Sequence, residues 1–270
     1  RHVLLYDSFD WKPPLYAHLP MILGPDKSKL SKRHGATSVV EYRDMGYLPD
    51  AMVNFLALLG WALDDKTEIL DREDLIRYFS IDRISKTAAI FSHDKLYWMN
   101  GVYLRQLVER QGAKEFCKLA LPFLEAELPA EVTRPLDEEY VERIVPLIYE
   151  RVNLVSEVAE RAGFFFVDEL DYETSSLLVK GVDRDKAIAS LKTCLKRFEG
   201  GPFDHDSIES LLRNLADELG LKAGILFGVV RVAVTGRTAS PPLFETMSVL
   251  GKERCLRRIA AAVARLEENA

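Results

Sequence analysis

Apolar residues recur three or four positions apart through most of the chain, and this spacing predicts α-helices. Residues 46–60 show the pattern clearly, because their apolar positions fall on one helical face. Pro49 suits the first turn of this helix, and Gly60 suits the position just past its end. The pattern therefore predicts a buried helix in this segment.

The same periodicity, together with capping residues, predicts further helices. Asp71 and Asp183 each precede such a run and suit the N-cap position, and Gly200 follows the second run as a stop signal. Pro146 is expected to kink or restart the helix that contains it. The predicted helical ranges are 71–79, 103–118, 137–163, 183–199, 206–219 and 223–235, followed by a last helix pair.

Strand signals are sparse in this sequence. Residues 2–6 (HVLLY) and 17–24 (AHLPMILG) each suit either a short strand or the end of a buried helix, which periodicity does not separate. Loops are expected near 128–136 and 200–204, where Pro and Gly occur. We therefore expect a mostly α fold with a little β.

Length and composition fit an ordinary globular protein of 270 residues, 48% hydrophobic and 29% charged. They exclude a disordered, collagen-like or disulfide-built chain. No apolar run approaches the ~20 residues that cross a bilayer, and the N-terminus lacks a secretion signal, so we expect a cytoplasmic protein without membrane contact. The three cysteines lie far apart, which predicts buried thiols and indicates no metal site.

The net charge of −6 argues against a surface that binds nucleic acid everywhere. The charge is nevertheless uneven. Residues 1–35 carry six Lys and Arg against three Asp, and residues 221–270 carry eight Lys and Arg against four Glu. Both ends of the chain are therefore basic, although solvated helix faces would explain the same counts.

The strongest local feature is a lysine-rich loop in residues 22–39, ILGPDKSKLSKRHGATSV. Its four cationic residues fall within seven positions and follow a Gly-Pro turn. Mobile ammonium groups of this kind suit a polyphosphate, whose charge they can balance in a transition state. The loop does not satisfy the Walker pattern, and a solvated basic surface loop remains the alternative.

Residues 29–33, KLSKR, resemble the KMSKS signature of class I aminoacyl-tRNA synthetases, and the surrounding sequence is similar to the glutamyl-tRNA synthetases in particular. The likeness continues through residues 48–61, 91–104 and 235–259, so it covers nearly the whole chain. It implies an enzyme family that activates glutamate with ATP and transfers it to the terminal adenosine of tRNA(Glu).

The resemblance also implies roles for residues of the loop. Lys32 would match the second signature lysine, which contacts the ATP phosphates, with Lys29 in support, and both would serve catalysis. Met21 and Ile22 would lie against adenine. Magnesium would accompany ATP in the intact enzyme, and we expect this chain to bind no cofactor tightly.

A second family signature, the HIGH-type motif that binds ATP phosphates, has no counterpart among the five dispersed histidines. We therefore expect the chain, which begins with Arg1, to be a C-terminal portion of a longer protein, with L-glutamate bound by an upstream domain. We also expect it to be monomeric and unable to form glutamyl-adenylate alone.

The family layout predicts three regions in this chain. Residues 1–108 would hold the edge of the catalytic domain and a stem-contact region with the signature loop. Residues 109–190 and 191–270 would each form a helical anticodon-binding module. The expected fold class is thus a mostly α stem-contact region with a little β, followed by two α-helical modules.

The resemblance places tRNA contacts along these regions. Arg151 matches the position where an arginine reads the third anticodon base, which would restrict binding to tRNA(Glu), although an exposed helix arginine is the plain alternative. Unstacked bases need flat apolar surface, polar groups and arginine. The expected contacts are Trp98 and Asn100 with the tRNA stem, Arg151, Arg231, Ser240, Pro241 and Leu243 with the anticodon, and Lys252, Arg254, Arg257 and Arg258 with phosphate.

Three other interpretations were considered. A glutaminyl-tRNA synthetase shares the loop region but ends in β-barrels, which the helical periodicity after residue 105 does not favour. A truncated paralogue that glutamylates a modified tRNA base has no anticodon-binding half. The third interpretation is an all-helical interaction module without an RNA ligand, in which the basic segments are ordinary solvated surface.

Overall fold

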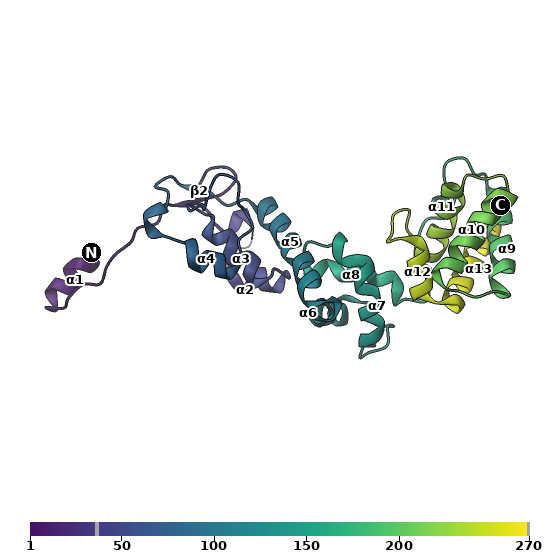
Figure 1. Cartoon of the computed structure of the whole chain (residues 1–270), viewed down its shortest axis with the longest axis horizontal. Helices are drawn as coiled ribbons and strands as arrows, with labels where there is room; N and C mark the ends of the chain where they lie inside the picture. Colours follow the sequence, from purple (N-terminus) through teal and green to yellow (C-terminus); the bar gives the residue numbers. More distant parts are fainter. Residues whose placement is uncertain (36–37, 269–270) are drawn as a thin grey trace. The chain divides into compact units, whose positions relative to one another are not determined.

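The computed structural model describes residues 1–35 and 38–268 of the chain and divides into two compact units. Unit 1 is Arg1–Asn100 and unit 2 is Gly101–Ala270, and helices dominate both, which confirms the expected mostly α fold. Figure 1 labels the elements. In the described part of the chain, no helix is both long and apolar enough to span a membrane.

Unit 1 combines short helices with a two-stranded parallel sheet, in which Ile22 pairs with Ala89 and Leu23 with Ile90. Phe91 N–H donates to Leu23 O (2.8 Å), which continues this pairing by one residue. The elements of the unit are α1 His2–Ser8, β1 Ile22–Leu23, η1 Lys32–His34, α2 Val39–Asp44, α3 Pro49–Ala57, α4 Arg72–Tyr78, η2 Ile81–Arg83, β2 Ala89–Ile90 and the start of α5 His93–Gln111.

The first of the two ambiguous apolar segments is a helix and the second contains a strand. HVLLY lies in α1, which buries none of its residues, and only Ile22–Leu23 of AHLPMILG forms a strand. Pro49 opens α3 as predicted, and Asp71 caps α4 by accepting a hydrogen bond from Asp74 N–H (2.9 Å). Capping chemistry was therefore a better guide in this unit than hydropathy.

The core of unit 1 forms where α3 and α4 pack together, around Trp61, Leu70 and Leu75. Asn54 is fully buried on α3, and its Oδ1 accepts a hydrogen bond from Leu70 N–H (3.0 Å). A buried polar side chain needs such a partner. This contact fixes the segment that leads into α4.

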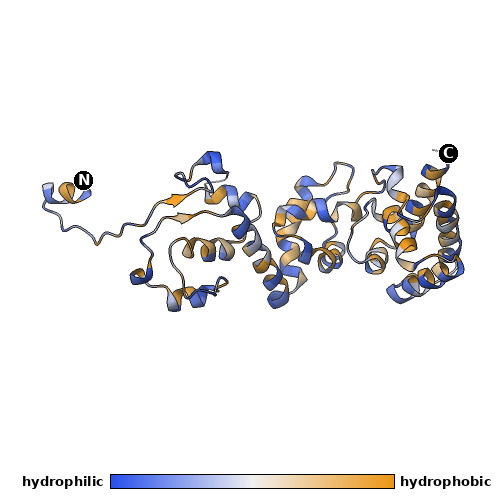
Figure 2. Cartoon of the chain, turned by 90° about the horizontal axis from the view of Figure 1, so that it is seen from above, coloured by the Kyte–Doolittle hydropathy of each residue, from blue (hydrophilic) through white to orange (hydrophobic). Residues whose placement is uncertain are grey.

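Unit 2 is built from helices alone in its described residues, so the structure offers no support for the β-barrel alternative. Figure 2 shows apolar helix faces turned toward the helices' neighbours in this unit. After the end of α5, the elements are α6 Ala113–Glu127, α7 Glu138–Ile148, η3 Tyr149–Arg151, η4 Val155–Glu157, α8 Val158–Ala162, η5 Gly163–Phe165, η6 Thr174–Leu177, α9 Arg184–Glu199, α10 His205–Glu218, α11 Ala223–Thr235, α12 Leu243–Leu250 and α13 Lys252–Glu268.

The helices expected at 206–219 and 223–235 match α10 and α11 to within one residue. Asp183 caps α9 as predicted, by accepting a hydrogen bond from Lys186 N–H (2.9 Å). The range 103–118 was wrong as one helix, because Gly112 takes a left-handed φ of 87° between α5 and α6. In the range 137–163, where a kink or restart at Pro146 was expected, α7 runs through Pro146 and ends at Ile148, and helical structure resumes in α8.

Helix α13 packs against α9 and α11, and α10 packs against α12. The three cysteines are buried and free in this unit, as expected. Burial raises the pKa of both Cys194 and Cys255 to about 12. The expected module boundaries near 108 and 190 fall inside α5 and α9, so the three-region division stays a prediction.

Candidate functional site

The lysine-rich loop folds as a tight hairpin at the end of β1. Gly24 N–H donates to Ser28 O (2.8 Å), and Leu30 N–H donates back to Ile22 O (3.0 Å). Lys27 sits at the tip with a positive φ of 60°, which is uncommon for a residue other than glycine. Backbone hydrogen bonds therefore hold the loop before its side chains are considered.

Side chains on the loop form a second network around Asp26. One carboxylate oxygen of Asp26 accepts hydrogen bonds from Ser28 N–H (2.9 Å) and Ser28 Oγ–H (2.7 Å). The other oxygen lies 3.3 Å from a guanidinium nitrogen of Arg33. The hydrogen bonds from Ser28, with a smaller effect of His34, hold the pKa of Asp26 well below its ordinary value.

The two lysines of the signature are on the surface of this hairpin. Lys29 and Lys32 are both exposed, and among the described residues no salt bridge engages either ammonium group. Arg33 differs from them, because it pairs with Asp26 and donates to Ser28 Oγ. The loop therefore presents the ammonium groups of Lys27, Lys29 and Lys32 to an external anion, while the guanidinium of Arg33 is engaged in contacts within the loop.

Met21 and Ile22 precede the hairpin. Met21 is 56% exposed, and Ile22 is half-buried in strand β1. An exposed thioether beside a strand end gives a planar ring an apolar surface to lie on. The structure thus leaves the expected adenine contact open to Met21.

The expected stem contact of Asn100 is wrong. Asn100 is fully buried at the end of unit 1, where its Oδ1 accepts a hydrogen bond from Leu48 N–H (2.8 Å). It fixes the turn before α3 and has no exposed surface for RNA. Trp98, on the same helix, is 44% exposed, so its stem contact stays a prediction.

The expected phosphate contact of Arg258 is also wrong. Arg258 is 3% exposed, and its guanidinium donates to Phe164 O (2.6 Å), Val167 O (2.7 Å) and Val234 O. Burial lowers its pKa to about 10, so it still carries its charge at neutral pH. A buried fork that satisfies three carbonyls is a structural element of unit 2.

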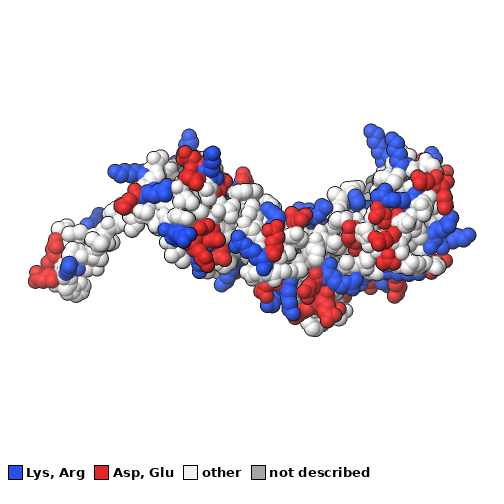
Figure 3. Space-filling view, in the orientation of Figure 1, with Lys and Arg blue, Asp and Glu red and all other residues white. Residues whose placement is uncertain are grey.

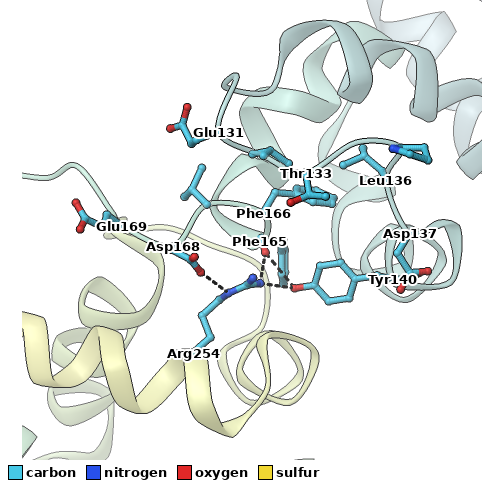
Figure 4. A pocket seen from close by; sticks show the side chains of 13 residues that line it. Glu131, Thr133, Leu136, Asp137, Tyr140, Phe165, Phe166, Asp168, Glu169 and Arg254 are labelled. Carbon is cyan, nitrogen blue, oxygen red and sulfur yellow. Dashed lines mark hydrogen bonds and ion pairs between the residues drawn. The ribbon is translucent and has the colours of Figure 1, made fainter.

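The neighbouring cations on α13 are partly committed in the same way. Arg254 donates to Phe165 O (2.6 Å) and Tyr140 Oη (3.2 Å), as Figure 4 shows. Lys252 donates to the carbonyls of Glu199 (2.8 Å) and Gly201 (3.1 Å). These contacts hold Lys252 and Arg254 against unit 2 and make them weaker candidates for a phosphate contact than an exposed cation.

Arg257 is the exposed member of this group. Its side chain is 55% exposed and pairs with Asp168 across 3.1 Å, and Asp168 is itself 66% exposed. An exposed pair of this kind is weak and exchanges readily with other ions. Of the four expected phosphate contacts, Arg257 alone is presented to an external phosphate.

A cavity of ≈ 730 Å³ lies beside Arg254 in unit 2. Figure 4 shows Tyr140 of α7 and its N-cap Asp137 on one side, and Asp168 and Glu169 on the other. Four carboxylates and one arginine line it: Glu131, Asp137, Asp168, Glu169 and Arg254. This balance of charge does not suit a phosphate chain.

The expected anticodon residues divide into exposed and buried positions. Arg151 is exposed on η3, and Arg231 is half-buried on α11. Pro241 and Leu243 are buried, which disfavours base stacking on either of them, and their anticodon contacts stay predictions. Ser240 is half-buried, and its hydroxyl donates to Pro241 O (3.0 Å).

Sequence reasoning missed residues whose side chains hold the lysine-rich loop and helix α13 to their neighbours. His34 was counted only among the dispersed histidines, yet its side chain is 8% exposed and contacts Asp26 and Ser31. Arg265 was not singled out, yet it donates to Leu170 O (2.7 Å) and Tyr172 O (3.1 Å). The one sequence signal for the arginines was their spacing of four and seven on α13, which is one helix face.

Charges of both signs cover the face shown in Figure 3, where Lys and Arg lie among Asp and Glu in both units. Within residues 1–35 and 38–268, no group of three or more His, Cys, Asp and Glu side chains could hold a metal ion. On this face the cations are therefore interspersed with carboxylates and form no continuous basic surface.

Two family models match the sequence. Residues 1–98 match the model described as tRNA synthetases class I (E and Q), catalytic domain. Residues 115–263 match the model described as anticodon binding domain. The two matches divide the chain close to the boundary between unit 1 and unit 2.

Named relatives agree with these matches. A glutamate–tRNA ligase of Dehalococcoides mccartyi is 51% identical over 99% of this chain and 55% of its own length, and one of Roseiflexus castenholzii is 44% identical over 97% and 52%. Among solved structures, a glutamate tRNA ligase from Elizabethkingia meningosepticum, in complex with its amino acid, has a TM-score of 0.79 at 28% identity, over 98% of this chain and 54% of that one. The chain thus spans about half the length of the relatives it matches.

Proposed function

Because this chain belongs to the glutamate–tRNA ligase family, we propose that it supplies the tRNA-binding surface and an ATP-contacting loop for the ligation of glutamate to tRNA(Glu). In this proposal unit 1 carries the loop and unit 2 carries the anticodon contacts. L-glutamate is bound by a region that this sequence does not contain. Magnesium enters with the ATP phosphates and needs no site built by these residues alone.

The observation that carries the proposal is the exposure of Lys29 and Lys32 on an ordered hairpin. Adenylate formation gathers negative charge on the α-phosphate and the departing pyrophosphate. Ammonium groups held near that charge stabilise the transition state more than the ground state. Lys32, at the start of η1, and Lys29, on the returning arm of the hairpin, can do this without breaking any ion pair of their own.

Discrimination between tRNAs falls to Arg151 in this proposal. It lies exposed on η3, directly after α7, and its guanidinium can form paired hydrogen bonds with a base edge. Arg231 and Ser240 support the anticodon contact, while Arg257 meets backbone phosphate and Trp98 the stem. Arg257 then adds affinity, and Arg151 adds selectivity.

Triphosphate binding tests the loop. We expect Lys29→Ala and Lys32→Ala each to weaken binding of inorganic triphosphate to the chain by about tenfold, the loss of one strong charged contact. Lys12→Ala, an exposed lysine outside the hairpin, is the matched control and should leave binding unchanged. Equal losses in all three variants would show a nonspecific charge effect and would contradict the proposal.

Filter binding of tRNA tests unit 2. We expect tRNA(Glu) to bind more tightly than tRNA(Gln), and Arg151→Gln to reduce that preference by roughly tenfold, the scale of one base-edge contact. Arg143→Gln, an exposed arginine on α7, is the control and should preserve the preference. Equal binding of all tRNAs by the unaltered chain would contradict the proposal.

Pyrophosphate exchange tests the expected division of labour. Because the 270 residues contain no HIGH-type tetrapeptide, we expect no exchange above background with this chain alone. Exchange at the rate of a ligase would show that these residues hold a complete adenylation site.

A further inference from the structure

We infer that His34 is the positioning residue of the lysine loop: its ring, wedged between Gly24, Ser31 and Asp26, holds the hairpin in the conformation that presents Lys29 and Lys32 to phosphate. The inference deepens the proposed function and rests on it. His34 itself touches no phosphate in this scheme. It acts through the backbone of the loop.

Burial is the first observation that supports this role. The His34 side chain is 8% exposed, although most residues around it on the loop are exposed. A β-carbon added to Gly24 would lie 2.8 Å from the His34 ring, closer than side chains pack. Glycine at position 24 therefore makes room for the ring, and the ring in turn fills the inside of the hairpin.

Hydrogen bonds fix the orientation of the ring. Ser31 N–H donates to Nδ1 of His34 (3.0 Å), so Nδ1 carries no proton. A neutral ring then carries its proton on Nε2, which lies 3.2 Å from a carboxylate oxygen of Asp26 and can donate to it. Nε of Arg33 lies 3.3 Å from the same ring nitrogen, so the Asp26 contact requires that the Arg33 N–H not occupy Nε2. One side chain thus joins the start of the hairpin, through Asp26, to its end, through Ser31.

Asp26 extends this brace to Arg33. Its second oxygen pairs with the Arg33 guanidinium at 3.3 Å, and Arg33 also donates to Ser28 Oγ. The guanidinium of Arg33 is therefore engaged in contacts within the hairpin. The ammonium groups of Lys29 and Lys32, with that of Lys27 at the tip, are left exposed on the loop.

Preorganisation is the benefit that follows. A disordered loop of four cations would have to be ordered at the moment of phosphate binding, at a cost in conformational entropy. A hairpin braced by His34 has met much of that cost during folding. Loss of the brace should therefore weaken phosphate binding even though both lysines remain.

Two substitutions separate the contacts of the ring. In His34→Asn, the amide oxygen sits close to the Nδ1 position and can still accept the Ser31 hydrogen bond. In His34→Gln, the amide reaches toward the Nε2 position and Asp26 but leaves Ser31 N–H without its acceptor. We expect tryptic cleavage at the loop lysines to accelerate about tenfold in His34→Gln and much less in His34→Asn, the scale of one lost hydrogen bond.

Nuclear magnetic resonance gives a signature that a merely structural role would not require. The nitrogen shifts of the His34 imidazole should show the Nε2–H tautomer in the unaltered chain. His18→Ala, an exposed histidine outside the loop, is the control for both measurements and should change neither. An Nδ1–H tautomer, or loop cleavage in His34→Gln at the unaltered rate, would overturn the inference.

Gly24→Ala tests the packing contact from the opposite side. It leaves every polar group in place, yet its methyl group collides with the ring, so we expect faster loop cleavage than in the unaltered chain. In a His34→Ala background that collision is gone, and Gly24→Ala should then add nothing. Equal effects of Gly24→Ala with and without His34 would overturn the inference.

Triphosphate binding separates this inference from the proposed function. If Lys32→Ala weakens binding and His34→Gln does so too, about tenfold, both stand. If Lys32→Ala weakens binding but His34→Gln does not, the proposed function stands and the positioning role fails. If neither lysine matters, the proposed function fails, and tautomer and cleavage still decide whether His34 braces the loop. Fluorescence of the buried Trp61 reports whether each variant has kept unit 1 folded.

Discussion

The lysine loop of unit 1 and helix α13 of unit 2 are both rich in cations, but the structure uses them in opposite ways. Lys29 and Lys32 are exposed on the loop without an ion pair among the described residues. On α13, Arg258 and Arg254 donate to backbone carbonyls inside the unit. A cluster of positive charges in a sequence therefore does not by itself indicate a binding surface.

The difference follows from what lies within reach of each cation. The hairpin is held by its own backbone hydrogen bonds, and among the described residues no salt bridge engages Lys29 or Lys32. The segment 164–172 runs beside α13 with few backbone partners of its own, and Arg258, Arg254 and Arg265 supply donors to its carbonyls. Buried carbonyls need such donors. The arginine fork, with five N–H groups, can serve several at once.

The largest test of this contrast is Arg258→Ala. Removal of the guanidinium leaves the carbonyls of Phe164, Val167 and Val234 without this donor, so we expect the free energy of unfolding to fall by about 3–5 kcal/mol. Urea denaturation measures the change. Cys255, buried on the same helix, should also react faster with a thiol reagent.

Lys29→Ala is the control for that measurement. An exposed lysine without an ion pair should change the free energy of unfolding by less than about 0.5 kcal/mol. If Arg258→Ala cost no more than Lys29→Ala, the carbonyl contacts would not be what holds the segment to α13. Arg258→Lys, which retains a donor, provides a milder variant if the alanine does not fold.

A smaller effect is expected from Arg254, which is partly exposed and donates to fewer groups. We expect Arg254→Ala to lower the free energy of unfolding by about 1–2 kcal/mol. Arg254→Lys should recover part of this, because one guanidinium nitrogen, Nη1, makes both hydrogen bonds and an ammonium nitrogen also carries enough donors for two. No recovery by lysine would show that the placement of the guanidinium, and not the presence of a cationic donor, is what matters there.

Arg257→Ala should affect stability least and RNA binding most among the α13 arginines. Its exposed pair with Asp168 is worth about 0–1 kcal/mol. If Arg257 contacts a phosphate, the slope of log affinity against log salt should fall by about one, with tRNA(Glu) and other tRNAs weakened alike. A loss confined to one tRNA would instead indicate a base contact.

These cases show how far the sequence could be read. Caps, such as Asp71 and Asp183, and the ends of α10 and α11 were predictable because they depend on local chemistry. The loop was found from its lysines and from a family resemblance. The burial of Arg258 was not predictable, because it depends on carbonyls 91 and 94 residues away in the chain.

The role of His34 was also not predicted, although its partners lie close to it in the sequence. Its acceptor contact with Ser31 spans three residues, and its packing against Gly24 spans ten, so every partner is local. In the sequence, His34 follows several cations and resembles a further charged surface residue. Only the folded hairpin shows that its ring is buried. Local contacts are therefore readable from sequence only when the turn that creates them is known.

The smallest expected difference between the lysine loop and α13 is their response to a fall in pH. The hydrogen bonds of Ser28, with a smaller effect of His34, lower the pKa of Asp26 in the folded chain. The ionised carboxylate therefore stabilises the folded hairpin at pH values above the ordinary carboxyl pKa. That contribution is lost as the pH falls through the lowered folded pKa. The contacts of Arg258 have carbonyl acceptors, which do not titrate, so they should show no such dependence.

Carbon NMR of the Asp26 carboxyl group checks this difference. Its titration midpoint should lie lower in the folded chain than in the urea-unfolded chain, and protection of the hairpin amides should fall with it. Asp26→Asn keeps an acceptor oxygen for Ser28 but does not titrate, so in that variant hairpin protection should no longer follow the carboxyl titration. If protection in Asp26→Asn fell with acid as it does in the unaltered chain, another titrating group would control the loop. The cations of the hairpin and of α13 would then differ in exposure alone. Acid titration would no longer distinguish a loop that presents its cations to a ligand from a helix whose arginines bond to backbone carbonyls.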